Sequence, residues 1–330
     1  MAACKVTRAA LAAALVLLAA ELTAEAQQTK VYRVGFLLQA SPPPPGSPPG
    51  FFGKALNDLG YIEGRNLFVD RRFAEGKAER FPSLAAELVA LKPDVIVADT
   101  TPGAIAAKRA TATIPIVMIN VSDPVGSGIV ASLARPGGNV TGVTDSGSEL
   151  AVKGVDLVHD IVPKVTRLAV LMSDNPVHPS QLRNIEDGAK RIGLTIVPTK
   201  VRSPEEFEEA FAPMARKKAG ALIVLGGAPF STERTRDQLV DLAAKTKLPT
   251  MYPSRWWVDA GGLLSYGPSA QYRSKLAAVY VDKILKGAKP RDLPVQQPAE
   301  FELAINLKTA KALGLSIPPS LLLRADQVIE

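Results

Sequence analysis

The chain has 330 residues, of which 47% are hydrophobic and 22% are charged, values close to the average of globular proteins that exclude a disordered or fibrous chain. One cysteine, Cys4, and two histidines, His159 and His178, exclude a disulfide framework and a zinc site built from Cys and His clusters. The net charge of +7 is scattered without a dense Lys/Arg run, so no nucleic acid partner and no metal site are expected. The length predicts two domains of ordinary size.

The first 26 residues have the pattern of a secretory signal peptide. Lys5 and Arg8 precede an uncharged run over 9–20. Ala24 and Ala26 then place small residues at the two positions that a signal peptidase recognises before its cleavage site. The run is shorter than the roughly 20 residues that a membrane-spanning helix needs. Cys4 lies before the run and not at the cleavage point, so a lipid anchor is not expected. The sequence therefore predicts cleavage near Ala26 and a periplasmic mature chain.

After the expected signal peptide, short β-branched runs alternate with amphipathic segments of helical length, which is typical of parallel α/β layers. The strands expected in the first half are 31–38, 67–73, 95–98, 116–120 and 140–143. Those expected in the second half are 167–172, 195–200, 221–225, 250–252 and 262–266. The expected helices include 51–59, 81–91, 104–110, 181–192, 204–217 and 232–246, with apolar residues three and four positions apart.

The two halves resemble each other. Residues 33–37 (RVGFL) match 167–171 (RLAVL), and the Leu-Gly-Tyr turn at 59–61 matches Ile-Gly-Leu at 192–194. An alternative is that any two doubly wound sheets share this pattern, but both interpretations predict two Rossmann-like lobes. Ligands bind beyond the carboxyl ends of parallel strands, so a cleft between the lobes that closes on a small molecule is expected.

Few residues could carry catalysis. His159 lies on an expected helix and His178 in an expected cleft loop, where it is the better candidate for a polar contact, but no G-x-S-x-G motif accompanies either. The stretch 126–131 formally matches G-x-G-x-x-A, with Asp145 nineteen residues after its first glycine, yet it follows a late strand and not the first one. We therefore expect neither an enzyme nor a cofactor.

Several longer segments resemble one known family. They are 60–66 (GYIEGRN), 123–126 (DPVG), 131–142 (ASLARPGGNVTG), 261–267 (GGLLSYG) and 306–315 (NLKTAKALGL). Together they make the chain similar, from about residue 33 to 330, to the ABC transporter substrate-binding proteins related to tryptophan and tyrosine uptake. This resemblance implies an α/β type I periplasmic binding protein fold, in which two Rossmann-like lobes with parallel sheets are joined by a three-strand hinge. It also implies a non-catalytic receptor that delivers a solute to an ABC permease in the inner membrane.

The resemblance places the three crossings near 142–148, 264–267 and 298–306. The expected lobes are then 27–143 with 267–299, and 144–266 with 300–330, so the helix over 270–286 joins the first lobe. One departure from the family is the proline-dense stretch 42–49 in the first cleft loop. Proline lacks an N–H donor, so this loop either stiffens the rim or is a tolerated insertion.

An amino-acid-like solute needs partners for its carboxylate, its ammonium group and its side chain. Thr100, Thr101 and Ser122 could receive the carboxylate, and Asp123 or Asp174 the ammonium group. A local gathering of Tyr252, Trp256, Trp257 and Tyr266 suggests stacking on a flat ligand, although one or both tryptophans could instead pack in the core. Arg255 could instead select an anion. The candidate ligand-binding residues are Ser41, Thr100, Thr101, Asn120, Ser122, Asp123, Thr141, Asp174, Asn175, Gly227, Tyr252, Arg255, Trp256 and Tyr266.

The sequence favours an exported, monomeric solute-binding protein that captures a small amino-acid-like ligand for an ABC importer, and the gathered rings suggest an aromatic one. Two alternatives stay open. One is a periplasmic sensor subunit that presents its ligand to a membrane receptor, and the other is a secreted enzyme on paired Rossmann-like lobes.

Overall fold

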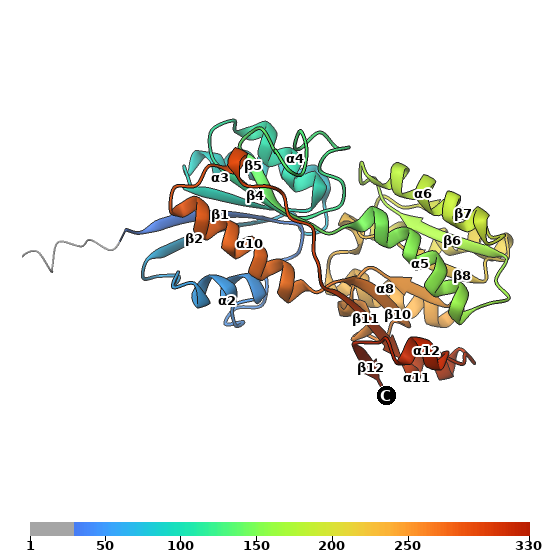
Figure 1. Cartoon of the computed structure of the whole chain (residues 1–330). Coiled ribbons are helices and arrows are strands. Elements are labelled where there is room, and N and C mark those ends of the chain that lie inside the picture. Colours follow the sequence, from blue (N-terminus) through green and yellow to red (C-terminus); the bar gives the residue numbers. More distant parts are fainter. Residues whose placement is uncertain (1–29) are drawn as a thin grey trace, which may run out of the picture.

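Two sheets, each covered by helices on both faces, form two lobes that lie side by side (Figure 1). The computed structural model describes residues 30–330, so the predicted signal peptide lies outside the described residues. The first sheet has the order β2-β1-β3-β4-β5 and is parallel throughout. Its strands are β1 (Tyr32–Leu38), β2 (Leu67–Phe73), β3 (Val95–Asp99), β4 (Ile116–Val121) and β5 (Val140–Thr144).

The second sheet has the order β12-β11-β10-β9-β8-β6-β7. Its strands are β6 (Arg167–Met172), β7 (Thr195–Lys200), β8 (Ala221–Val224), β9 (Thr250–Tyr252), β10 (Leu264–Pro268), β11 (Phe301–Asn306) and β12 (Gln327–Ile329). The ten strands expected from the sequence are confirmed to within two residues at each end. The parallel sheets expected from the sequence are confirmed, with the one exception in this sheet that β11 pairs antiparallel with β10. The chain enters β11 on its return from the first lobe and so runs in the opposite direction.

Helices cover both sheets. In the first half they are α2 (Phe51–Asp58), α3 (Phe81–Ala90) and α4 (Thr100–Ala110), with the 3-10 turn η1 (Ala78–Arg80). In the second half they are α5 (Gly147–Ile161), α6 (His178–Arg191), α7 (Phe207–Arg216), α8 (Glu233–Lys245) and α9 (Arg255–Val258), with η2 (Pro204–Glu206) and η3 (Ala228–Phe230). The last part of the chain holds α10 (Ala270–Leu285), η4 (Pro290–Asp292), α11 (Leu307–Ala312) and α12 (Pro319–Leu322). Among residues 30–330, no helix has both the length and the apolar character needed to cross a bilayer.

The core of each lobe lies on the two faces of its sheet. Along β3, Val95 and Val97 contribute to one apolar cluster, whereas Ile96 and Ala98 contribute to another. Such continuous apolar runs are typical of strands that are buried on both faces. The second sheet is covered in the same way by two further clusters.

The chain passes between the two sheets three times. It leaves β5 of the first sheet and enters α5, whose Val155 packs in the core of the second lobe. After β10 of the second sheet it enters α10, which lies beside α2 in Figure 1 and packs Val281 in the core of the first lobe. Tyr61 fixes this arrangement by donating a hydrogen bond from its hydroxyl to Asp282 on α10, at 2.9 Å. The chain then returns to the second sheet as β11.

Gly142 on β5 stands where no side chain can be placed. Its φ is +135°, and a Cβ atom there would lie 2.2 Å from the Met118 carbonyl oxygen and 2.7 Å from the Met118 nitrogen on β4. We expect Gly142→Ala to lower the free energy of unfolding by roughly 3 kcal/mol, because it adds both overpacking and backbone strain. Urea denaturation measures this change.

Gly138→Ala is the matched control for this substitution. A Cβ atom at Gly138 meets nothing within 4 Å, and the residue has no positive φ. Its effect should stay within about 0.5 kcal/mol. Equal stability of the two variants would show that β4 and β5 are not packed as described.

Candidate functional site

A cavity of about 310 Å³ lies between the two lobes. It is lined by segments that follow β1, β3, β4 and β5 of the first sheet, and by segments at the ends of β6, β8, β9 and β10 of the second. The carboxyl ends of parallel strands all meet at one edge of a sheet, and here the two edges face each other. The volume is at the lower end of the range, from about 300 Å³, that is usual for small-molecule sites.

The first lobe gives the cavity a polar end. Asp99, the last residue of β3, accepts a hydrogen bond from the Asn120 side-chain amide at 2.7 Å and one from the Gln39 backbone N–H at 3.3 Å. Burial raises the pKa of the Asp99 carboxyl group, and these hydrogen bonds oppose the shift. Asp145, directly after β5, accepts from the Ser122 hydroxyl at 3.1 Å and from the Gly147 N–H at 2.8 Å.

Arg273 brings a positive charge to the same end, from the first turns of α10. Burial lowers the pKa of its guanidinium group, while the nearby Asp145 and Asp99 raise it. An arginine stays charged in proteins, so the cavity holds one cation beside two carboxyl groups. Its Nε atom is buried and, within residues 30–330, has no hydrogen-bond partner.

Two more polar atoms around this end are unsatisfied. Thr100 Oγ1 and Asn120 Oδ1 are buried and have no partner in the described part of the chain. Both residues line the cavity and have left-handed backbones, with φ values of 65° and 59°. That conformation is unusual for a β-branched residue such as threonine, and strain of this kind is concentrated at functional sites. Because buried polar groups are normally hydrogen-bonded, these atoms indicate where a polar ligand group binds.

The second lobe contributes an aromatic wall. The rings of Tyr252 and Trp257 are stacked, with centroids 5.1 Å apart and planes at 12°, and Trp256 meets Trp257 edge-on at 5.6 Å. Tyr252 and Trp257 are only 1% and 2% exposed, so they belong to the core as well as to the cavity lining. Trp256 is half-buried and carries the Arg236 guanidinium 4.5 Å from its ring centroid. Tyr266 completes the wall and stacks on Phe301.

The structure brings eight of the candidate residues together around the cavity. They are Thr100, Asn120, Ser122, Asn175, Gly227, Tyr252, Trp256 and Tyr266. It places the other six outside the cavity lining. They are Ser41, Thr101, Asp123, Thr141, Asp174 and Arg255.

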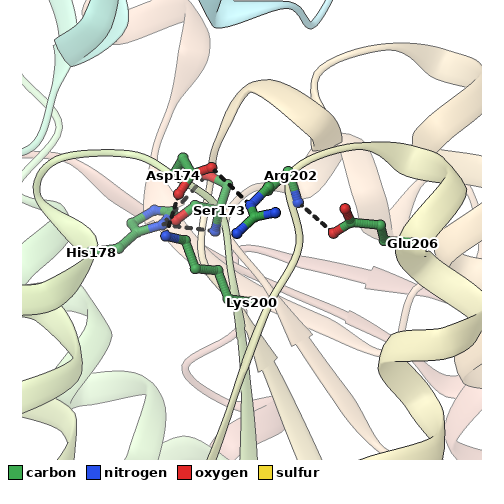
Figure 2. Close-up of polar contacts among 6 residues, drawn as sticks. All are labelled: Ser173, Asp174, His178, Lys200, Arg202 and Glu206. Atoms are coloured by element: carbon green, nitrogen blue, oxygen red, sulfur yellow. Dashed lines mark hydrogen bonds and ion pairs between the residues drawn. The ribbon is translucent and has the colours of Figure 1, made fainter.

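The charged residues among these six have partners elsewhere. Asp123 accepts a hydrogen bond from the Gly126 N–H at 2.8 Å and so closes a turn. Asp174 forms ion pairs with Lys200 and Arg202 (Figure 2). Arg255 pairs with Asp259 at 3.2 Å and with Glu302 at 3.3 Å.

The remaining three also lie away from the cavity lining. Thr141 donates to the Leu293 carbonyl at 2.6 Å and thereby ties β5 to the segment after α10. Thr101 is buried on α4, and Ser41 is exposed at the start of the proline-dense loop.

Sequence reasoning missed several polar residues of the lining. They are Gln39, Asp99, Asp145, Gln181 and Arg273. Asp99 and Asp145 stand at the carboxyl ends of expected strands, so the strand-end rule could have found them. Arg273 carried no such signal, because it lies on a helix far along the chain. Within residues 30–330, no group of three or more His, Cys, Asp or Glu side chains is placed to hold a metal ion.

The two lobes also touch at the rim of the cavity. Gly76 follows β2 with φ +76°, and its N–H donates to the Gln39 carbonyl of the lining at 2.9 Å. A Cβ atom on Gly76 would lie 3.0 Å from the carbonyl oxygen of Ala228 in the second lobe. The close approach of the lobes at this point therefore depends on the absence of a side chain.

The comparisons with known proteins agree with this geometry. The family model described as ABC transporter substrate binding protein matches residues 49–329. A "Tyrosine-binding protein" of Clostridioides difficile (strain R20291) is 31% identical over 266 residues, covering 80% of this chain and 75% of its own length. The chain belongs to the family of ABC transporter substrate-binding proteins.

Solved structures show the same relationship. An "ABC domain in complex with L-Trp" from Streptococcus pneumonia has a TM-score of 0.80 and 28% identity, with 91% of this chain and all 100% of that one covered. A conserved domain protein from Vibrio cholerae has a TM-score of 0.83 and 29% identity, with the same coverage. A ligand-free, open substrate-binding protein from Clostridium difficile has a TM-score of 0.63 and 26% identity, covering 91% of this chain and 99% of that one.

These findings confirm the resemblance read from the sequence, together with the type I periplasmic binding fold. Members of the family are extracellular or periplasmic proteins that bind small-molecule solutes for ABC transporters. The sensor and the enzyme alternatives are not favoured, because the family and the relatives are binding proteins of ABC transporters.

Proposed function

We propose that this chain binds an aromatic amino acid between its lobes and delivers it to the permease of an ABC importer. The observation that carries the proposal is a cavity with two different ends. One end holds Arg273 beside Asp99 and Asp145, and the other is an aromatic wall.

The polar end has the groups that a zwitterion requires. The Arg273 guanidinium, with its unpartnered Nε, is suited to the ligand carboxylate. The carboxylate of Asp145 and the free carbonyl oxygen of Asn120 are suited to the ammonium group. Because charged groups must be paired when they are buried, this combination favours an amino acid over a neutral solute.

The other end supports an aromatic side chain. Trp256 and Tyr266 are half-buried and border the cavity, so a flat ring can cover them at little entropic cost. Two relatives agree with such a ligand, since one is named a tyrosine-binding protein and another was solved in complex with L-Trp.

The proposal includes closure of the lobes over the ligand. The chain is more similar to the L-Trp complex, at a TM-score of 0.80, than to the ligand-free, open protein, at 0.63. The rim contact between Gly76 and Ala228 belongs to this closed arrangement.

In this proposal the lobes comprise residues 27–143 with 267–299, and 144–266 with 300–330. The chain acts as a monomer in the periplasm after loss of residues 1–26. It carries the ligand unchanged, without catalysis. Residues of both lobes contact the permease together only when the two lobes are closed.

Arg273→Gln tests the head-group assignment. By isothermal titration calorimetry we expect this substitution to weaken L-tryptophan binding roughly thirtyfold, or about 2 kcal/mol, because a charge-assisted hydrogen bond is lost. Tryptamine has no carboxylate, so its binding should not weaken. Lys275→Gln, an exposed residue on the same helix, is the control and should leave both affinities unchanged. Equal losses for both ligands in Arg273→Gln would contradict the assignment.

Gly76→Asn tests closure at the rim. Asparagine tolerates a positive φ, so the variant should fold, but its side chain must displace the Ala228 carbonyl. We expect its Kd for L-tryptophan to rise about tenfold, which corresponds to about 1.4 kcal/mol.

Gly60→Asn is the matched control for the rim, since Gly60 has φ +88° and a Cβ atom there would meet nothing within 4 Å. This variant should bind like the unmodified protein. If the two variants bind L-tryptophan equally well, the rim contact has no part in ligand capture.

A further inference from the structure

His178 forms a bridge between two strand ends beneath the cavity. It is the first residue of α6 and is 2% exposed. Figure 2 shows its ring against Ser173, which directly follows β6. On its other side the ring reaches Gly226, which follows β8 and lines the cavity.

The hydrogen bonds of this ring fit a neutral imidazole. The Ser173 backbone N–H donates to Nδ1 at 2.9 Å, so this nitrogen acts as an acceptor. Nε2 then carries the proton and donates it to the Gly226 carbonyl oxygen at 2.8 Å. Nδ1 also lies 3.1 Å from the Ser173 carbonyl oxygen, so a proton on Nδ1 would be donated to that oxygen. The Ser173 N–H would then lose its acceptor and face the new N–H across 2.9 Å, and this repulsion favours a turn of the ring.

The ring and Ser173 together set the position of the cavity wall. Gly227 lies so close to them that a Cβ atom there would be 2.2 Å from Ser173 Oγ and 3.4 Å from His178 Cε1. Gly226 and Gly227 carry no side chains, so hydrogen bonds to their backbone hold this segment. The Phe230 N–H donates to the Gly227 carbonyl at 3.0 Å, and the His178 ring donates to the Gly226 carbonyl at 2.8 Å. A turn of the His178 ring therefore removes the bond that holds the Gly226 part of the wall.

The charges around the ring favour its neutral form. Burial lowers the pKa of His178 and is the largest effect, while the hydrogen bonds to the Ser173 and Gly226 backbone raise it. Lys200 on β7 lowers this pKa, and Asp145 across the cavity raises it. Asp174, next to Ser173, pairs with Lys200 and Arg202 (Figure 2). The Arg202 backbone N–H in turn donates to Glu206, so the acidic groups of this cluster are engaged with other partners.

We propose that His178 is a positioning residue whose neutral imidazole holds the Gly226–Gly227 wall in place for the ligand, and whose protonation releases that wall. The proposal rests on the proposed function, because it takes the cavity as the binding site for an amino acid. It makes ligand binding sensitive to acid through a group that does not touch the ligand.

Affinity as a function of pH is the first test, and the chain is well suited to it because it has two histidines. By calorimetry, the Kd for L-tryptophan should rise as the pH falls from 7.5 to 5.0, and the rise should approach about tenfold once the ring is protonated, equivalent to a pKa that is one unit lower in the complex. His178→Gln keeps a donor for Gly226 without titrating. It should bind less tightly at pH 7.5 but show a flat pH profile, while His178→Ala should lose more affinity. His159→Gln is the control and should keep the pH dependence.

Nuclear magnetic resonance of the protein without ligand is the second test. The amide signals of Gly226 and Gly227 should shift with the titration of the His178 ring and stay constant in His178→Gln. A pH profile in His178→Gln equal to that of the unmodified protein would overturn the proposal. Amide signals of Gly226 and Gly227 that stay constant while the His178 ring titrates would overturn it as well. Failure of L-tryptophan to bind at any pH would instead overturn the proposed ligand, and the glycine signals would still decide the role of His178.

Discussion

The direction of the strands is the constraint on which the site depends. In a parallel sheet every strand ends at the same edge, and the helix that follows begins there. The chain places two such edges against each other, so that short segments after β3, β4, β5 and β8 enclose one cavity. Residues far apart in sequence, such as Asp99 and Arg273, therefore face a common space. The polar end and the aromatic wall both follow from this arrangement.

The arrangement of the two sheet edges also places polar interactions and aromatic interactions on opposite sides of the cavity. The first lobe supplies charged and hydrogen-bonding groups that are only partly satisfied by one another, whereas the second supplies stacked rings that are also part of its core. Opening the lobes would separate these two surfaces and leave the Arg273 side chain to water. In the proposed function, a ligand with one charged and one aromatic end is bound by both lobes only when they are closed, and this closed shape is the one presented to the permease.

The sequence was sufficient for β1 to β10, because β-branched apolar runs bounded by glycine and proline identify them, and for the family, because long motifs match. The strands β11 and β12 were not among those expected, although the resemblance placed a crossing near 298–306. It was weaker at element ends. The helix α4 begins at Thr100 and not at the expected residue 104, since Pro102 in its first turn needs no N–H partner. It was weakest for the site. Asp174 and Asp145 both follow strands. Asp174 forms an ion pair with Lys200 on the neighbouring β7 and lies outside the cavity lining, whereas Asp145 lines the cavity. Such a choice depends on the neighbouring strand and cannot be read from one segment.

The most direct measurement of the central claim is a crystal structure of the protein grown with L-tryptophan. We expect the ligand in the cavity between the lobes, with its carboxylate within hydrogen-bond distance of the Arg273 guanidinium and its indole ring against Trp256. A closed protein with this cavity occupied only by water, or a ligand bound with its ring toward Arg273, would contradict the proposed mode of binding.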